Sequence, residues 1–249
     1  MRAALRAEVR KLKRGVWIAA GAALLVVASC ARNGGDSPQW KAVGYFALLT
    51  NLSMMNAVAM PLTMAALASR LWDVETKGNG CRLLYTLQSR ESLFAAKALL
   101  GMGQNLMLCA AECAGFVALG RLAGYTQALE PARVAWLFVS TFAVNAMLFF
   151  AALLLSVLSR TQALPLGAGL IASLTGVFTA FMPEALAGFV PWAYYLPMSA
   201  LRMHYDREAR IAQFEPLPWA MPAALLAMSL LLGALAFGLA LRTVRNREV

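Results

Sequence analysis

The stretch that decides the fold is VAWLFVSTFAVNAMLFFAALLLSVLS, residues 134–159. It contains no acidic or basic residue. It is also longer than the roughly 20 residues that a helix needs to cross the hydrocarbon core of a bilayer. It lacks the alternation of apolar and polar residues that marks a strand of a membrane β-barrel. Because backbone polar groups find no water in lipid, a helix is the structure that satisfies them within one segment. Residues 134–159 therefore predict a transmembrane helix.

Five further apolar blocks repeat this pattern. Of the 249 residues, 61% are hydrophobic and 14% are charged, whereas soluble proteins average about 45–50% apolar and about 25% charged residues. Pro61 lies inside the second block, where we expect it to free a backbone carbonyl and bend the helix. The six predicted spans are 15–31, 42–69, 98–120, 134–159, 163–182 and 219–241. We expect an all-α polytopic membrane protein in which residues 1–249 form a single transmembrane domain.

Lysine and arginine are distributed unevenly between the two sides of these spans. Of the 22 basic residues, 15 lie in the amino-terminal segment, the 70–97 loop, the turn after span four and the carboxyl-terminal tail. Because basic residues favour the cytoplasmic side, both termini and the 70–97 loop are predicted to be cytoplasmic in a bacterial cytoplasmic membrane. This topology accounts for the formal charge of +10. No nucleic-acid partner is expected, since the basic residues flank spans and form no single patch with aromatic residues.

The amino-terminal residues 1–14 have the pattern of an amphipathic helix. Apolar residues fall on one face of RAALRAEVRKLKR, and basic residues fall elsewhere. Such a helix lies in the membrane interface with its cations toward lipid headgroups. The alternative is a simple basic flank of span one.

The four cysteines predict neither a disulfide framework nor a metal site. Cys30 is expected near the outer face and Cys81 in the cytoplasm, so these two cannot pair. Cys109 and Cys113 lie one helical turn apart with no histidine near them, whereas zinc sites usually have four ligands. The stretch VASC at 27–30 resembles a lipoprotein processing site, and a mass shift on Cys30 would reveal lipidation.

The cytoplasmic loop has more pattern than a connector requires. Residues 71–75 continue span two, and Lys-Gly-Asn-Gly at 77–80 predicts a turn. Residues 81–88, CRLLYTLQ, are expected to form a short helix with leucines on one side. Ser89 suits an N-cap, and Glu91 suits the first turn of a helix that continues into span three.

The outer segment 183–218 is the longest connection on its side of the membrane. Five prolines divide it, and its aromatic residues suit the membrane–water boundary. We expect short re-entrant or interfacial helices here, and a loop of this length is usually functional. The chain's single histidine, His204, is interpreted as an ordinary surface or interface residue.

The sequence lacks the motifs that would carry covalent chemistry. It has no GxxxxGK[ST] phosphate-binding loop and no HExxH metal motif. No pair of carboxylates lies within one span. We therefore expect no catalytic residue, no bound metal or cofactor and no ATPase site in this chain.

Polar residues inside the spans form a second pattern. Gln104 and Asn105 precede Glu112 by eight and seven residues, which places all three on one helical face. Because a carboxylate facing lipid is costly, this face is predicted to point inward. Spans two and four supply Asn56 and Asn145. Two interpretations stay open: hydrogen bonds between helices, with Glu112 neutral or paired, or a polar cavity on a transport pathway.

The sequence resembles the permease subunits of type-2 ABC exporters in three features. These are an amphipathic basic leader, six spans with both ends inside, and an elaborate first cytoplasmic loop. The loop carries the most specific likeness, which is an acid at the end of span two, a glycine turn, a leucine pair, a Ser-Arg start of span three and a following lysine. These residues are Glu75, Gly78, Gly80, Leu83, Leu84, Ser89, Arg90 and Lys97. The sequence departs from the pattern at Gln88, where proline is common. The length, with no large outer domain and no attached ATPase, resembles the lantibiotic-immunity and bacitracin-resistance permeases.

This resemblance implies that the loop carries a coupling helix that docks on an ATP-binding subunit. The implied coupling residues are Trp72, Asp73, Glu75, Arg82, Leu83, Leu84, Leu87 and Arg90. The implied partners are two ATP-binding subunits, which hold ATP and Mg, and a second permease, identical or homologous, within membrane lipid.

The resemblance also implies export of an amphipathic antimicrobial peptide. The candidate substrate pathway consists of Asn56, Asn105, Glu112, Asn145, Trp192, Tyr194 and Tyr195. Three alternatives stay open: an ABC permease for a lipid, polysaccharide or haem; a secondary transporter driven by an ion gradient through Glu112; and a membrane scaffold that transports nothing.

Overall fold

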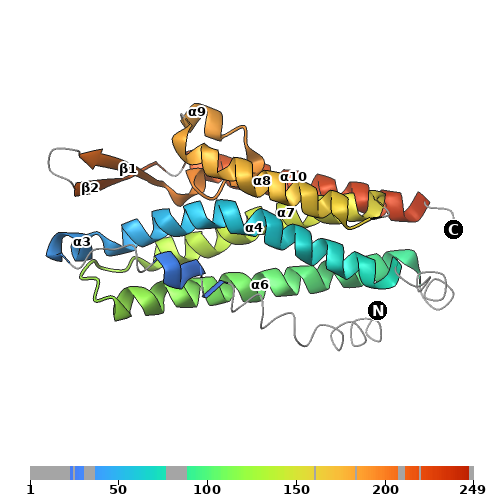
Figure 1. The fold of residues 1–249 in the computed structure, drawn as a ribbon, viewed down its shortest axis with the longest axis horizontal. Helices are drawn as coiled ribbons and strands as arrows, with labels where there is room; N and C mark the ends of the chain where they lie inside the picture. The colour runs from blue at the N-terminus through green and yellow to red at the C-terminus, as the bar shows by residue number, and fades with distance from the viewer. Residues whose placement is uncertain are drawn as a thin grey trace.

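The computed structural model describes residues 23–24, 26–30, 37–76, 89–159, 161–182, 184–206, 211–218 and 220–246. Long helices dominate this part of the chain (Figure 1). The elements in chain order are α3 (Pro38–Ala42), α4 (Gly44–Thr76), α6 (Arg90–Leu122), α7 (Pro131–Leu158), α8 (Ala163–Phe178), the 3-10 turn η1 (Thr179–Phe181), α9 (Glu184–Ala187), the 3-10 turns η2 (Pro191–Ala193) and η3 (Pro197–Ser199), β1 (Leu201–Asp206), β2 (Ile211–Pro216) and α10 (Ala220–Asn246).

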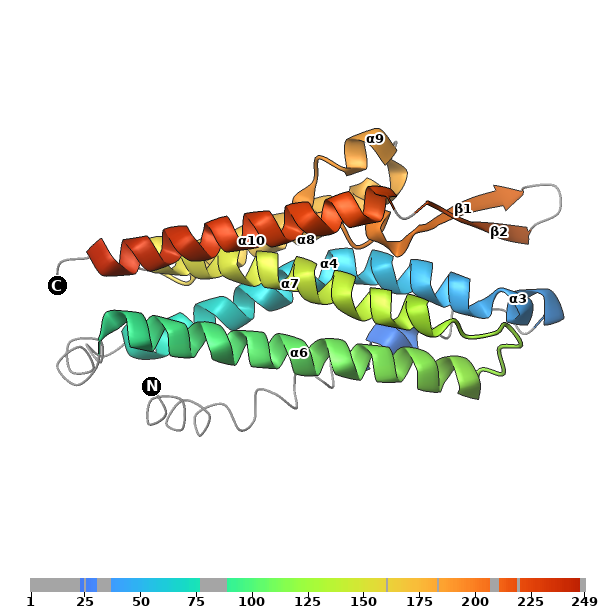
Figure 2. The same cartoon turned by 180° about the vertical axis from the view of Figure 1, so that it is seen from behind.

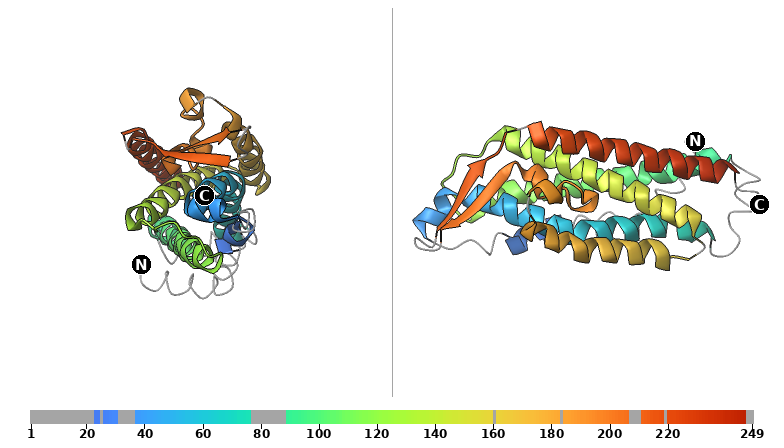
Figure 3. Two further views of the ribbon diagram at one scale, coloured as in Figure 1. Left: turned by 90° about the vertical axis from the view of Figure 1, so that its left-hand side faces the viewer. Right: turned by 90° about the horizontal axis from the view of Figure 1, so that it is seen from above.

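The helices α4, α6, α7, α8 and α10 run along the long axis of the molecule as a bundle (Figures 1 and 2). Helix α7 is central and contacts the other four. The view along the long axis shows the helices side by side, as a bundle seen from its end (Figure 3). The strands, α3 and the loop 123–130 lie at one end, which we term the hairpin end. The end of α4, the start of α6 and the end of α10 lie at the other, which we term the C-terminal end.

Four of the six predicted spans are confirmed as helices long and apolar enough to cross a membrane. They are Gly44–Asp73, Arg90–Leu122, Pro131–Leu158 and Met221–Asn246. The fifth predicted span is a shorter apolar helix, Ala163–Phe178, continued by η1. Most of the first predicted span and all of residues 1–14 lie outside the described residues.

The prediction of an all-α chain is wrong in the outer segment, where β1 and β2 form an antiparallel hairpin. Met203 pairs with Phe214, and His204 pairs with Gln213. The sequence LRMHYD alternates apolar and polar residues, which is the period of a strand. Ala200 has a φ of 55° and turns the chain into β1. The expected short helices are confirmed only before the hairpin, as α9, η2 and η3.

Small residues bring α8 against α4 at Pro61. Proline has no N–H to donate to the carbonyl four residues earlier, which is that of Ala57. A Cβ built on Gly176 of α8 would lie 2.6 Å from that carbonyl oxygen. Ser173 Oγ accepts a hydrogen bond of 3.2 Å from the Leu62 N–H beside the proline. Small side chains thus permit the close approach that packing between membrane helices requires.

Candidate functional site

The polar face predicted on span three points into the bundle, as expected. Gln104, Asn105 and Glu112 of α6 are 5%, 0% and 1% exposed. Asn56 of α4 and Asn145 of α7 are also fully buried. We term these five residues, with Tyr195, the buried polar cluster.

One chain of hydrogen bonds in this cluster links α6, α7 and the outer segment. The Tyr195 hydroxyl donates to Asn145 Oδ1 at 2.6 Å. Asn145 Nδ2 donates to Asn105 Oδ1 at 2.9 Å, and Asn105 Nδ2 donates to the Phe142 carbonyl at 3.1 Å. Burial raises the pKa of the Tyr195 phenol well above its ordinary value. The phenol therefore stays protonated and keeps its role as donor.

A second hydrogen bond of the cluster joins α4 to α6. Asn56 Nδ2 donates to Glu112 Oε1. Among the described residues, Asn56 Oδ1, Glu112 Oε2 and Gln104 Nε2 are buried without a hydrogen-bond partner. Buried polar atoms are nearly always paired, so these three atoms need an explanation.

Two other residues predicted for the pathway lie outside this cluster. The Tyr194 hydroxyl donates to the Gly188 carbonyl at 2.9 Å, within the outer segment. Trp192 Nε1 donates to Thr175 Oγ1 of α8 at 3.0 Å. Tyr194 and Tyr195 are 2% and 4% exposed. Tyr195, through Asn145 of α7, and Trp192, through Thr175 of α8, therefore fix the outer segment onto the bundle.

The residues predicted for coupling lie at the C-terminal end, as far as they are described. Trp72 is buried and packs edge-to-face on Phe94, with ring centroids 6.5 Å apart. Asp73 and Arg90 are half-buried. The remaining coupling positions lie outside the described residues or have side chains that are not described. They are Glu75, Arg82, Leu83, Leu84 and Leu87.

The helix start predicted at this end is confirmed. Ser89 is the N-cap of α6, and its hydroxyl accepts from the Ser92 N–H at 3.3 Å. Glu91 in the first turn pairs with Arg245 of α10. Lys97, 1% exposed, donates through Nζ to the Leu71 carbonyl of α4. This last contact ties the two helices on either side of residues 77–88.

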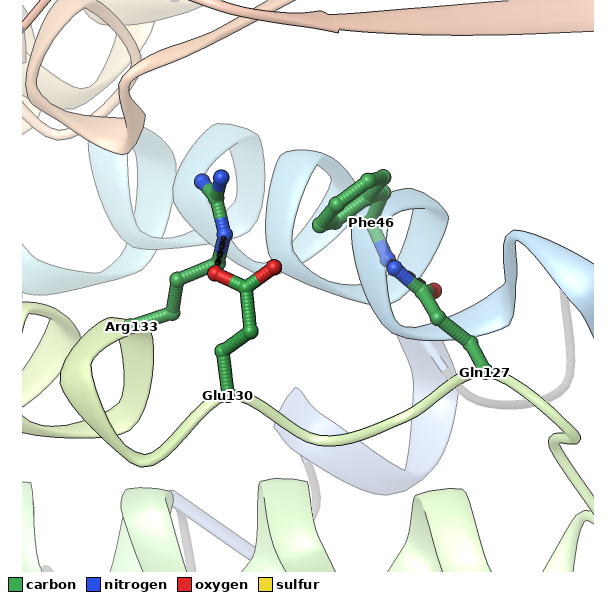
Figure 4. A network of polar contacts seen from close by, with 4 residues as sticks. All are labelled: Phe46, Gln127, Glu130 and Arg133. Carbon is green, nitrogen blue, oxygen red and sulfur yellow. Dashed lines mark hydrogen bonds and ion pairs between the residues drawn. The ribbon is translucent and has the colours of Figure 1, made fainter.

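Sequence reasoning missed a network at the hairpin end (Figure 4). Gln127 Oε1 accepts hydrogen bonds from the N–H groups of Tyr45 at 3.0 Å and Phe46 at 3.3 Å. Arg133 pairs with Glu130 at 2.7 Å, and its guanidinium lies 4.9 Å from the centre of the Phe46 ring. The i, i+3 spacing of Glu130 and Arg133 was the one signal in the sequence. The Gln127 contact spans 82 positions and left no local pattern.

A cavity of about 280 Å³ beneath the hairpin was also missed. Four methionines and five other apolar residues dominate its lining, and its polar members include Asn51 and Arg202. The methionines are Met54, Met182, Met203 and Met221. Because methionine is flexible and polarisable, such a wall adapts to differently shaped apolar groups.

Comparison with known families identifies the class of protein. The model of the ABC-2 family transporter protein matches residues 4–176. The chain belongs to the ABC-2 transporter family. No curated protein is significantly similar to it in sequence. With its apolar helices, this ABC-2 chain is a multi-pass membrane protein of the permease type, and such permeases work with an ATP-binding subunit.

The matched range covers only part of the candidate site of the ABC-2 chain. Asn56, Asn105, Glu112 and Asn145 fall inside the matched range, as do residues 77–88. Tyr195, the hairpin and the cavity beneath it fall outside that range. No group of three or more metal-ligating side chains occurs among the described residues.

Proposed function

We propose that the chain is the membrane-spanning permease of an ATP-driven exporter of amphipathic antimicrobial peptides, which protects the cell that carries it. It pairs with a second permease, identical or homologous, and with two ATP-binding subunits. It lies in the bacterial cytoplasmic membrane with both termini in the cytoplasm. The observation that carries this proposal is the family match over residues 4–176, which includes the segment between α4 and α6.

The length of α4 and α6 supports a contact with a soluble subunit. Each helix has 33 residues, or about 50 Å at 1.5 Å per residue. The hydrocarbon core is only about 30 Å thick. In the proposed orientation, both helices project into the cytoplasm at the C-terminal end of the bundle, where residues 77–88 join the end of α4 to the start of α6. The leucines there would enter an apolar groove of the ATP-binding subunit, with charged residues at the rim.

Contacts between the two helices would transmit movement of that subunit. The Lys97–Leu71 hydrogen bond and the Trp72–Phe94 ring contact join α4 to α6 near the docking segment. The Asn56–Glu112 hydrogen bond joins them again twenty residues before the end of α4. A push on residues 77–88 would therefore move the two helices together and reach the buried polar cluster.

The methionine-lined cavity supports a cargo with apolar side chains. Its volume of about 280 Å³ is just below the roughly 300–1,000 Å³ of small-molecule sites, so it suits one or two apolar side chains of a larger cargo. Its position beneath the hairpin is at the outer surface in the proposed orientation. An amphipathic peptide offers such side chains while its polar face stays in water.

Copurification tests the central part of this proposal. The tagged chain is purified in mild detergent, and the bound subunits are identified by intact-subunit mass spectrometry. We expect an ATP-binding subunit with the wild type and its loss from Leu83→Asp/Leu84→Asp. The matched control is Leu122→Asp, the same change at an 81% exposed leucine at the hairpin end. A wild type that binds no ATP-binding subunit, or an equal loss in the control, contradicts the proposal.

A further inference from the structure

Two buried oxygen atoms without donors lie between α4 and α6. Asn56 Nδ2 donates to Glu112 Oε1. The other oxygen of each group, Asn56 Oδ1 and Glu112 Oε2, has no hydrogen-bond partner in the part of the chain that the structure describes. The two side chains are 0% and 1% exposed. Leaving a buried acceptor unpaired is unfavourable, and more so for a charged group.

Among the residues that the structure describes, the groups around Glu112 offer no positive charge to a carboxylate. The groups that interact electrostatically with Glu112 are three thiols and one phenol. Thiols and phenols are ordinarily neutral at pH 7. They are Cys30, Cys109, Cys113 and Tyr195. Helix α4 contributes the neutral amide of Asn56, and α7 contributes that of Asn145 to the same cluster. The buried cation of α6, Lys97, is fifteen residues away along the helix, or about 22 Å.

We propose that Asn56 and Glu112 form a proton-binding site in which Glu112 is a neutral carboxylic acid. A proton on Oε2 is donated to Asn56 Oδ1, while Asn56 Nδ2 donates to Oε1. The carboxylic acid of Glu112 and the amide of Asn56 are then joined by two hydrogen bonds, which close a planar ring. One proton supplies the donor that both oxygens lack and removes the buried charge.

The site has a direct consequence for the contact between α4 and α6. With the proton bound, two hydrogen bonds hold the middle of α4 to α6. When the helices separate and water enters, Glu112 releases the proton to that water and its carboxylate becomes hydrated. The bound proton thus favours the closed arrangement of the two helices. The site is built from the chain's own side chains and does not depend on the cargo.

Infrared spectroscopy of the full-length chain tests the site directly. The chain is labelled with ¹³C at its glutamate carboxyl groups and measured in detergent at pH 7. We expect a carbonyl stretch of a protonated carboxylic acid that shifts on labelling and is lost in Glu112→Gln. We expect this variant to fold, because the glutamine amide can donate to Asn56 Oδ1 in place of the acid. The control Glu91→Gln changes an exposed glutamate at the C-terminal end and keeps the band.

A second variant identifies the partner of the proton. Asn56→Leu removes the carboxamide, so the carbonyl band is expected to move to higher frequency as its hydrogen bonds are lost. An unchanged band overturns the assignment of Asn56. The absence of a protonated band at pH 7, with carboxylate bands alone, overturns the proton site. A carboxylate band that responds to exchange of Na⁺ for K⁺ identifies a bound cation and also overturns it.

Discussion

At the scale of single residues, the absence of a side chain at Gly176 allows α8 to approach α4. The Ala57 carbonyl receives no hydrogen bond from Pro61, and the helix surface there is open to a neighbour. Gly176 lies against this carbonyl, and Ser173 accepts from the Leu62 N–H one turn away. The proline and the glycine therefore form one packing unit from two helices.

Gly176→Ala should destabilise the chain. Its Cβ would meet the Ala57 carbonyl oxygen at 2.6 Å, and backbone cannot rotate away as a side chain can. We expect a loss of about 1–3 kcal/mol, the usual cost of overpacking, measured as a lower midpoint of thermal unfolding in detergent. The matched control is Gly167→Ala on the same helix, where a Cβ has no neighbour within 4 Å. An equal effect of both substitutions would refute the packing account.

At the scale of elements, the start of α4 depends on a side chain from a distant loop. The first N–H groups of a helix have no partner within it. Gln127 supplies one carbonyl oxygen to two of them, those of Tyr45 and Phe46. Phe46 in turn contacts Phe214 of the hairpin, with ring centroids 6.4 Å apart. The loop, α4 and the hairpin are thus joined at one end of the bundle.

Gln127→Ala should loosen this end. Loss of a capping side chain costs about 1 kcal/mol, so we expect a reduced unfolding midpoint and faster hydrogen exchange at the first turn of α4. Gln162→Ala is the control, because Gln162 stands at the start of α8 and makes no side-chain capping bond. If Gln127→Ala leaves exchange at Tyr45 and Phe46 unchanged, the loop does not cap the helix.

The same elements show what the sequence can and cannot predict. The inward face of Asn105 and Glu112 follows from helical spacing alone, which is local, and so does the Ser89 cap. The contacts that complete the site are not local. The Leu62–Ser173 bond spans 111 positions and the Asn145–Asn105 bond spans 40. The hairpin was missed because prolines and aromatic residues in 183–218 also suit interfacial helices, and only pairing with β2 decides for strands.

At the scale of the whole molecule, the chain is a bundle whose two ends are joined differently. The hairpin end is closed by Gln127, the aromatic rings and the outer segment. The C-terminal end is held by Lys97, Trp72 and the pair between Arg245 and Glu91. The buried polar cluster lies between the ends. Movement imposed at one end must therefore pass through contacts among α4, α6 and α7.

Lys97→Met should separate binding of the ATP-binding subunit from transport. The docking residues stay intact, so that subunit should still copurify. The tie between Lys97 and the Leu71 carbonyl is lost, so peptide-stimulated ATP hydrolysis should fall by about 5-fold or more, within the usual range of coupling free energies. Lys41→Met at the hairpin end is the control and should leave the stimulation unchanged. Full stimulation in Lys97→Met would mean that this contact transmits nothing.

The most direct test of the exporter account is peptide transport by the purified complex in liposomes. A lantibiotic and bacitracin serve as peptides, and ATP hydrolysis and peptide movement are followed together. The account predicts that peptide stimulates hydrolysis, that transport stops without ATP, and that ionophores that abolish ion gradients have no effect. Transport that continues without ATP and stops with an ionophore would contradict it. Hydrolysis that neither peptide stimulates would contradict the proposed cargo.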